Sequence, residues 1–354
     1  MTKKLKNKLS ERQNAILAFI EIGKSASIGQ IFKHIQKDLG QITKITISRD
    51  LEKLLGLGFI ERQGAGRAVV YKLSSEYPII KKIDVEKYFS AEVDQRKIKK
   101  EFNFDIFSQL KNIFTDDEKN RLIELDGIYR GKIKDISTDA LRKEIERLNI
   151  DFSWKSSKIE GNTYSLLETE QLIKNRQEAP GRTKEEAVMI LNHKKALDYI
   201  SNNKTDFQSI SVLKIENVHS LLVDGLNVTK NLRKTLVGIT GTNYKPLDNE
   251  FQIREALEKA VKKTNEKENI FEKAVTLMLL IAYIQPFVDG NKRTSRLSGN
   301  AILQSFGSCP LSYRSMDEVE YKKAILLFYE QNNVSYFKEL FLKQFEFAVK
   351  NYFG

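Results

Sequence analysis

Apolar residues recur at helical spacing over the first 55 positions of the chain, and they predict three short helices. The first begins directly after Ser10, which has the spacing of a capping box with Gln13. The second is expected from about Ser27 to Gly40, where the glycine ends it. The third covers residues 43–55, with apolar side chains facing inward and polar side chains facing outward. The N-terminal region is therefore expected to start as a small helical unit.

A β-hairpin is expected directly after the third helix. The runs 59–62 and 68–73 are rich in β-branched and aromatic residues, and a glycine-rich tip that carries Arg67 separates them. The outward side chains of the third helix are polar or basic, and they are long enough to reach base edges or phosphates in a DNA major groove. These outward residues are Lys44, Thr46, Ser48 and Arg49.

The rest of the chain has a mainly helical pattern. Residues 81–112 are mixed in character, with one helical turn expected at 85–89, and we predict a packed connector there. A capping box at Thr115 opens a helix that is expected to end near Tyr129. The segment 271–284 is apolar on nearly every side, which predicts a helix through the middle of a helical domain.

The length of 354 residues exceeds one typical domain of roughly 100–200 residues. The patterns divide the chain into a unit at 1–80, a connector at 81–112 and a helical domain at 113–354. Hydrophobic residues make up 41% of the chain, which permits a sizeable core and excludes an intrinsically disordered protein. The predicted fold class is mainly α, with a small α+β unit before the helical domain.

Neither a secretory signal nor a membrane-spanning segment is predicted. The longest apolar run is 274–284, which is much shorter than the stretch of about 20 residues that a bilayer-spanning helix needs. The single cysteine, Cys309, cannot form an internal disulfide and suits a reducing compartment. We therefore expect a cytoplasmic protein with no membrane partner, and the sequence leaves open whether it forms a homodimer.

Positive charge is concentrated at the N-terminal end of the sequence. The formal net charge of the chain is +12, and residues 1–80 contain 14 Lys and Arg against 7 Asp and Glu. A basic unit suggests a polyanionic partner, but a lysine-rich composition without such a partner would produce the same bias. Charge alone does not distinguish the two.

The order of three helices and a hairpin resembles a winged helix-turn-helix over about residues 8–75. The resemblance implies a unit whose third helix and hairpin tip contact double-stranded DNA. Winged helices also serve as protein-interaction or dimerisation modules. The basic outward face of the third helix, together with Arg67, favours DNA.

Residues 285–296 combine the features of a phosphate-binding site. Pro286 ends the apolar helix, and the turn behind it leads into a new helix whose first backbone N–H groups can attract an anion. Arg293 and Arg296 lie three residues apart on one face of that helix and can bond phosphate oxygens. Asp289 supplies a carboxylate of the kind that binds Mg²⁺ together with the phosphates of a substrate.

The same segment resembles the core motif of Fic proteins, HPFx[DE]GN[GK]RxxR. Most members of this family transfer AMP from Mg·ATP to a hydroxyl side chain of a target protein. The matching positions in this chain are Pro286, Phe287, Asp289, Gly290, Asn291, Lys292, Arg293 and Arg296. The alternative interpretation is a plain junction between two helices, with a solvated pair of arginines.

The resemblance to Fic proteins implies a role for most of these residues. Asp289 would hold Mg²⁺, and the turn from Gly290 to Lys292 would bind the phosphates through its backbone. Asn291 and Arg293 would orient the phosphates, and Phe287 would anchor the turn in the core. ATP and Mg²⁺ are the cofactors that the resemblance implies, and its partner is an unidentified target protein.

Residues 156–162 contain a stretch that resembles the inhibitory motif [ST]xxxE[GN], which precedes the core motif in many Fic proteins. Ser156 and Glu160 are four residues apart and share one helix face. By resemblance, Glu160 pairs with Arg296 and keeps the terminal phosphate of the nucleotide from settling productively. Without the core motif this spacing would mean little, because it is common on exposed helices.

Residues 237–246 resemble the flap hairpin of the family, whose edge pairs with an extended segment of the target protein. The candidate contact residues are Val237, Ile239 and Tyr244. A purely structural hairpin near 235–246 would contain the same residues, so the two interpretations stay open.

Gln285 stands where the family motif has a histidine, which takes the proton from the attacking hydroxyl. A glutamine amide can hydrogen-bond that hydroxyl, but it has no usable basicity near neutral pH. Loss of a general base typically lowers a rate by about 10²- to 10⁴-fold. The histidines His34, His193 and His219 are all distant from the motif in sequence, and replacement of the base by His193 or His219 stays open.

Two functions are therefore compatible with the sequence. The first is a Fic-type AMP transferase that Glu160 inhibits and Gln285 weakens. The second is a DNA-binding regulator whose Fic domain binds a nucleotide without transferring any part of it. Lys292 also occurs at its position in the related Doc toxins, which transfer a phosphate, whereas Gly290 and Arg296 favour AMP transfer. The sequence also leaves open whether Gln285 is natural or an engineered replacement of the histidine.

Overall fold

The computed structural model describes residues 9–353, which form two compact units. The first unit ends at Lys81 and the second begins at Lys82. Each unit encloses its own hydrophobic core. Four of the lysines that make the N-terminal region basic lie outside the described residues, and they are Lys3, Lys4, Lys6 and Lys8.

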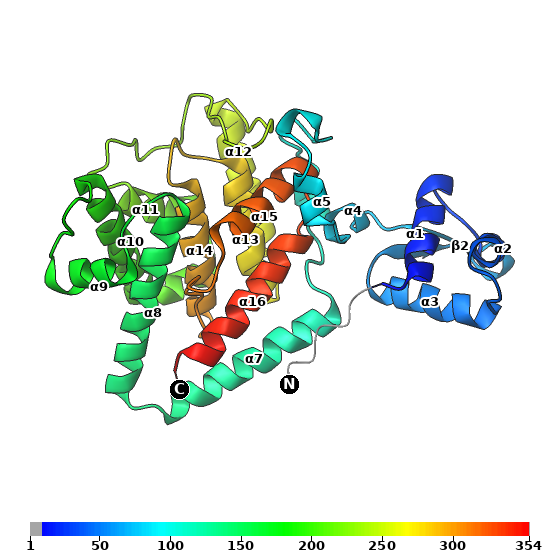
Figure 1. Cartoon of the computed structure of the whole chain (residues 1–354), viewed down its shortest axis with the longest axis horizontal. Helices are drawn as coiled ribbons and strands as arrows, with labels where there is room; N and C mark the ends of the chain where they lie inside the picture. Colours follow the sequence, from blue (N-terminus) through cyan, green and yellow to red (C-terminus); the bar gives the residue numbers. More distant parts are fainter. Residues whose placement is uncertain (1–8, 354) are drawn as a thin grey trace. The chain divides into compact units, whose positions relative to one another are not determined.

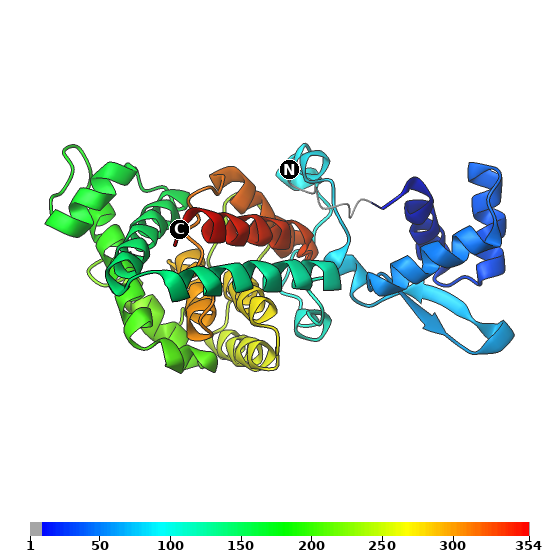
Figure 2. The same cartoon turned by 90° about the horizontal axis from the view of Figure 1, so that it is seen from below.

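The first unit contains three helices and a two-stranded antiparallel sheet, in the order expected from the sequence (Figure 1). Figure 2 shows the two strands as a narrow ribbon that follows the third helix. The strands pair with Ile60 opposite Leu73 and with Gln63 opposite Val70. The elements are α1 (Glu11–Gly23), α2 (Ile28–Leu39), α3 (Lys44–Gly56), β1 (Ile60–Gln63) and β2 (Val70–Leu73), and the short helix α4 (Tyr77–Ile80) follows them.

Local sequence signals account for the helix ends of the first unit. The Ser10 hydroxyl accepts from the backbone N–H of Gln13, whose side chain accepts from the Ser10 N–H, so the predicted capping box is present. Gly40 follows α2 with a φ of 82°, a conformation that glycine adopts without strain. Ile16 and Ile47 are fully buried, as the helical spacing predicts.

The second unit is almost entirely helical, which confirms the predicted mainly α class. No helix within residues 9–353 is both long and apolar enough to cross a bilayer. Helix α7 continues past the predicted end at Tyr129 to Asp135, and it lies alongside α16 (Figure 1). The helices are α5 (Val85–Phe89), α6 (Ile106–Gln109), α7 (Asp116–Asp135), α8 (Thr138–Ile159), α9 (Leu166–Asn175), α10 (Lys184–Asn202), α11 (Val212–Leu222), α12 (Glu250–Asn265), α13 (Ile270–Ile284), α14 (Asn291–Ser305), α15 (Glu318–Gln331) and α16 (Ser335–Asn351).

Helix α13 runs through the middle of the second unit, as its apolar sequence predicts. Every residue from Phe271 to Ile284 is buried. Helix α14 packs closely against it, because Gly299 leaves room for the Met278 side chain, and a Cβ at that glycine would collide with the Met278 sulfur. This close packing sets the direction in which α14 leaves the loop at 285–290.

Residues 82–112 belong to the second unit and pack on its surface helices. The Lys99 backbone N–H donates to the Glu330 carbonyl in α15 at 2.9 Å. The Phe102 ring stacks on Tyr283 with 4.6 Å between ring centroids. These contacts hold residues 82–112 against the ends of α13 and α15.

The segment 235–247, called the flap segment below, is not the β-hairpin that the sequence predicted. It turns at Gly241, which has a φ of 88°, but its two arms form no β ladder. The carbonyls of Thr235 and Leu247 accept from the Arg233 guanidinium, and the Lys245 N–H pairs with the Lys100 carbonyl. These backbone groups are therefore bonded to residues outside the flap segment and not to each other.

Candidate functional site

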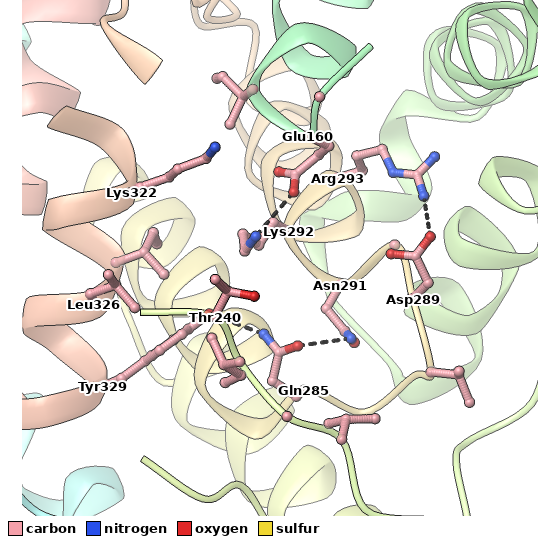
Figure 3. Close-up of a pocket in the computed structure, with 18 residues that line it drawn as sticks. Glu160, Thr240, Gln285, Asp289, Asn291, Lys292, Arg293, Lys322, Leu326 and Tyr329 are labelled. Carbon is pink, nitrogen blue, oxygen red and sulfur yellow. Dashed lines mark hydrogen bonds and ion pairs between the residues drawn. The ribbon is translucent and has the colours of Figure 1, made fainter. Parts of the chain in front are cut away.

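Most of the site residues predicted in the helical domain surround one cavity of about 470 Å³. Its floor is the loop between α13 and α14, and its other sides are the end of α8, the flap segment and α15 (Figure 3). Of the predicted residues, Ser156, Arg296 and Tyr244 do not line it. The lining consists of Ile159, Glu160, Gly161, residues 237–240, Gln285, residues 288–293, Lys322, Ile325, Leu326 and Tyr329.

Gln285 sits directly after α13, where the backbone turns with a φ of 51°. This left-handed conformation is uncommon for a residue with a side chain, and it points the amide toward the cavity. The amide nitrogen donates to the Ala282 carbonyl at 2.6 Å and to the Tyr329 hydroxyl at 3.0 Å. The amide oxygen accepts from Asn291 at 3.0 Å (Figure 3). Gln285 is therefore held on both sides of its amide.

Asn291, the first residue of α14, closes the loop between the two helices. Its side-chain oxygen accepts from the Phe287 N–H at 2.9 Å, and its nitrogen donates to the Phe287 carbonyl at 2.7 Å. A third bond joins the same nitrogen to Gln285. The predicted role of Asn291 was phosphate orientation, but its amide is already bonded to the loop itself.

Gly290 is required at the N-cap of α14 for two physical reasons. Its φ of 81° is one that residues with a Cβ rarely adopt. A Cβ there would also approach the His219 ring to 3.4 Å. The glycine lets the chain turn into α14, whose first residues line the cavity, and the unpaired backbone N–H groups at a helix N-terminus generally attract anions.

His219 supports the loop from behind. Its ring stacks on Phe287 with 3.6 Å between centroids, and Nε2 lies 3.0 Å from the Asp289 carbonyl oxygen. Burial lowers the pKa of His219 to about 4, so the ring is neutral near pH 7. Phe287 is fully buried, as expected for a core anchor.

Arg293 and Asp289 form an ion pair at the edge of the cavity. Arg293 Nη2 lies 2.9 Å from Asp289 Oδ2, and the Asp289 side chain is 62% exposed (Figure 3). The Nε and Nη1 groups of Arg293 are buried and have no hydrogen-bond acceptor within the described residues. Burial lowers the pKa of Arg293, although the nearby Asp289 and Glu160 carboxylates oppose that shift. A bound anion would supply the missing acceptors.

Glu160 directly follows the last residue of α8, and its side chain reaches residues of α14 at the cavity. Its Oε1 lies 2.9 Å from Arg296 Nη2, and its Oε2 lies 3.0 Å from Lys292 Nζ. Arg296 is fully buried, and the Ser156 hydroxyl accepts from its Nε at 2.9 Å. Arg296 thus contacts both Ser156 and Glu160, and the family resemblance led us to expect the contact with Glu160.

Two positive charges keep Glu160 ionised. Burial by itself would raise the pKa of Glu160, but the charges of Arg296 and Lys292 outweigh burial and lower the pKa to about 2. Arg296 and Lys292 consequently share the single negative charge of Glu160 in this structure. Lys322 of α15 also lines the cavity, and it has no carboxylate partner within the described residues.

No histidine in the described part of the chain lines the cavity. His193 is fully buried against Phe152, and burial, assisted by the charges of Arg296 and Arg293, lowers its pKa well below the usual value. His219 lies behind the loop, and His34 belongs to the first unit. Neither His193 nor His219 occupies the position of a general base for a group in the cavity.

Among the described residues that line the cavity, Asp289 is the one carboxylate that is mostly exposed. The part of the chain at 9–353 contains no cluster of three or more side chains that would hold a metal ion by themselves. Mg²⁺ commonly binds one or two carboxylates together with the phosphates of a nucleotide. A single exposed carboxylate, Asp289, fits Mg²⁺ that arrives bound to a nucleotide. It does not fit a metal ion that the protein would hold by itself.

Arg233 is a site residue that sequence reasoning missed. It is 1% exposed and donates to the carbonyls of Gln285 at 2.6 Å, Thr235 at 2.8 Å and Leu247. Its backbone N–H also donates to the Pro286 carbonyl at 3.0 Å. Arg233 therefore joins both ends of the flap segment to the loop after α13. No local sequence signal indicates this role.

The connector also touches the flap segment, which the sequence did not predict. Arg96 donates to the Gly241 carbonyl at 2.6 Å and lies 3.3 Å from the Glu330 carboxylate. Asn243 donates to Asp94 at 2.8 Å. Tyr244, expected to contact a target protein, is instead buried and stacks on Tyr283 at 4.8 Å, because its ring completes the core beneath the flap segment.

The residues proposed to contact DNA lie on one helix and one turn of the first unit. Lys44, Arg49 and Arg67 are exposed, whereas Thr46 and Ser48 are half-buried. The Thr46 hydroxyl is 3.0 Å from that of Thr43. Of the five residues predicted to contact DNA, Lys44, Arg49 and Arg67 are accordingly the more exposed.

Comparisons with known proteins agree with the geometry of the second unit. Residues 209–303 match the model of the Fic/DOC family. The protein adenylyltransferase Fic of Nematostella vectensis is 28% identical over 185 residues, which cover 51% of this chain and 43% of the relative. Protein adenylyltransferase fic-1 of Caenorhabditis elegans is 23% identical over 221 residues, which cover 61% and 43%. The chain thus spans less than half the length of these relatives.

Solved structures share the fold of the helical unit. Fic-1 of Caenorhabditis elegans aligns with a TM-score of 0.57 at 19% identity, covering 66% of this chain and 70% of that one. A signalling protein with a Fic domain from Bacteroides thetaiotaomicron aligns with a TM-score of 0.57 at 16% identity, covering 65% and 94%. At these identities the likeness concerns the fold alone.

Proposed function

Because the chain is a Fic family protein, with its family domain at residues 209–303, we propose that its cavity binds Mg·ATP and transfers AMP to a hydroxyl side chain of a target protein. Glu160 restrains this activity, and Gln285 makes it weak because the expected histidine is absent. Relatives that carry the name protein adenylyltransferase support the general activity. The substrate, the residue roles and the target interaction are parts of the proposal.

The observation that carries the proposal is the set of anion-seeking groups at the start of α14. Backbone N–H groups, Lys292 and the buried Arg293 surround one end of the cavity, and two nitrogens of Arg293 have no acceptor among residues 9–353. Helix N-termini and arginines together bind phosphates strongly. Mg²⁺ bound with the nucleotide at Asp289 would neutralise further phosphate charge.

The transfer forms a bond between the target hydroxyl oxygen and the α-phosphorus, and it releases pyrophosphate and a proton. Arg293 and the α14 N–H groups stabilise the charge on the phosphates. The Gln285 oxygen, which already accepts from Asn291, can accept one more hydrogen bond from the attacking hydroxyl but cannot remove its proton. Water must take that proton, and we expect the rate to fall by about 10²- to 10⁴-fold relative to a histidine.

Glu160 would inhibit by occupying the cations that a nucleotide needs. Its contacts with Arg296 and Lys292 leave neither free for the terminal phosphate. Release of this carboxylate would let the triphosphate reach both residues.

The target would pair with the flap segment in an extended conformation. Residues 237–240 line the cavity, and Val237 and Ile239 are partly exposed there. Main-chain pairing along such a segment would fix the register of the target, so that one hydroxyl faces Gln285.

A second function is favoured by a different observation. The Gln285 amide is bonded on both sides, which suits a stable binding site better than a reactive one. In this alternative, the first unit binds double-stranded DNA and the second unit senses a nucleotide without transfer. Both functions are placed in the cytoplasm, in keeping with the single, buried Cys309.

The test is incubation with ATP labelled at the α-phosphate, using the wild type, Gln285→His, Glu160→Gly and the double variant. The proposal expects the strongest label on protein with the double variant and a weak signal with the wild type. Label from the γ-phosphate instead would identify phosphate transfer. Calorimetric binding of Mg·ATP without any label from the wild type or Glu160→Gly would favour the sensor. Absence of both binding and label in every variant would contradict both functions.

A further inference from the structure

The hydrogen bonds around Gln285 have directions that the backbone dictates. The Phe287 N–H can only donate, so the Asn291 atom that it meets at 2.9 Å must be the oxygen. The Asn291 nitrogen therefore faces Gln285, and the Gln285 atom 3.0 Å away must be the oxygen. The amide orientations follow from this chemistry and not from a choice between two similar atoms.

The same reasoning continues on the other side of the Gln285 amide. The Ala282 carbonyl can only accept, so it takes one hydrogen of the Gln285 nitrogen. The second hydrogen goes to the Tyr329 hydroxyl, which lies 3.0 Å away. Both hydrogens of Gln285 are thus used, and the Tyr329 oxygen acts as an acceptor.

Tyr329 keeps a hydrogen of its own. Within residues 9–353 its hydroxyl meets no acceptor, because the contact with Gln285 uses only the oxygen. The side chain is fully buried, yet it lines the cavity beside Gln285 (Figure 3). A buried donor without an acceptor is costly, and proteins rarely leave one in that state. Burial also raises the pKa of Tyr329 well above its usual value, which keeps the hydrogen in place.

We propose that Tyr329 is a ligand-binding residue whose hydroxyl donates a hydrogen bond to an oxygen of the bound nucleotide. Gln285 orients this donor by giving its own hydrogen to the tyrosine oxygen. The residue at the expected base position therefore acts through Tyr329, and the donor at this end of the cavity comes from α15. The inference rests on the proposed nucleotide site.

The experiment measures Mg·ATP affinity calorimetrically for the wild type, Tyr329→Phe and Tyr164→Phe. Tyr164 is the matched control, because this buried tyrosine does not line the cavity and its hydroxyl accepts from the Ala179 N–H. We expect Tyr329→Phe to weaken binding about tenfold and Tyr164→Phe to leave it unchanged. Equal affinity of Tyr329→Phe and the wild type would overturn the inference and leave the nucleotide site intact. Failure of the wild type to bind Mg·ATP would instead contradict the proposed site itself.

A second substitution separates donation from packing. Tyr329→4-aminophenylalanine keeps a hydrogen-bond donor at the same place on the ring, and we expect it to restore affinity to within about threefold of the wild type. If it binds as weakly as Tyr329→Phe, the donor role is wrong. Thermal unfolding of each variant checks that the fold is retained. If Tyr329→Phe does not fold, the inference is tested by comparing the amino variant with the wild type. A folded amino variant that binds Mg·ATP tenfold more weakly than the wild type would contradict hydrogen-bond donation to the nucleotide.

Discussion

Glu160 and Arg296 form an ion pair with 2.9 Å between Oε1 and Nη2, and the arginine has no exposed surface. Truncation of one partner of a buried pair leaves the other charge without compensation. Because Lys292 binds the same carboxylate at 3.0 Å, two cations share one negative charge. A single carboxylate therefore controls how much positive charge the cavity can offer to a phosphate.

Glu160→Gln should raise the affinity for Mg·ATP by about tenfold, since Lys292 and Arg296 would then be free to meet phosphate charge. Calorimetry would measure the change. Glu258→Gln, at an exposed position of α12 outside the cavity, is the matched control and should have no effect. Unchanged affinity in Glu160→Gln would show that the carboxylate does not compete with the nucleotide.

The contribution of Glu160 to stability should depend on pH. Its pKa is about 2 in the folded protein, below the usual value of 4.5, so the ionised form is stabilised by folding. That stabilisation is fully present above about pH 4.5 and is lost as the pH falls toward 2. Urea unfolding should therefore show a difference between the wild type and Glu160→Gln that shrinks below about pH 4.5. A difference that grows on acidification would contradict the assignment.

Arg233→Met should destabilise the protein by about 2–4 kcal/mol, because it leaves several buried carbonyls without a donor. The affected carbonyls include those of Gln285, Thr235 and Leu247. Limited proteolysis should then cut within the flap segment. Arg254→Met, which removes a half-exposed arginine of α12, should do neither. If the flap segment of Arg233→Met resists proteolysis as well as that of the wild type, Arg233 does not hold this segment in place.

Gly290→Ala should destabilise the protein by about 1–2 kcal/mol and abolish nucleotide binding. The φ of 81° strains a residue with a Cβ, and the new methyl group would approach the His219 ring. Gly131→Ala is the control, because that helical glycine has open space around it and should become slightly more stable. Thermal unfolding and ATP titration would measure both variants.

Arg49→Ala combined with Arg67→Ala should weaken binding of the full chain to double-stranded DNA. The affinity should also become less sensitive to salt. In a plot of the logarithm of the binding constant against the logarithm of the salt concentration, each lost phosphate contact should reduce the steepness of the line by about 0.9. Gel shifts over a salt series on a promoter fragment would measure this. Arg142→Ala, an exposed site in α8, should leave the shift unchanged. Equal binding by the double variant would exclude these residues as DNA contacts.

The sequence by itself determined the features that depend on neighbours along the chain. The capping boxes at Ser10 and Thr115 start helices because serine or threonine meets backbone N–H groups three residues ahead. The run 271–284 became a buried helix because it has no polar face to present to water. The loop at 285–290 follows from Pro286, which restricts the backbone locally, and from Gly290, which adopts a positive φ without strain.

Only the tertiary structure decided which distant groups share the cavity. The flap segment lacks a ladder because Arg233 and Lys100 use backbone groups that hairpin pairing would need, and Tyr329 reaches Gln285 from a helix that begins 33 residues later in the chain. Such partners are chosen by packing of whole helices, which brings segments together without a local sequence signal. Glu160 and Arg296 lie between these cases: a family resemblance suggested their pairing, but the distance and the burial that hold Glu160 ionised are properties of the fold.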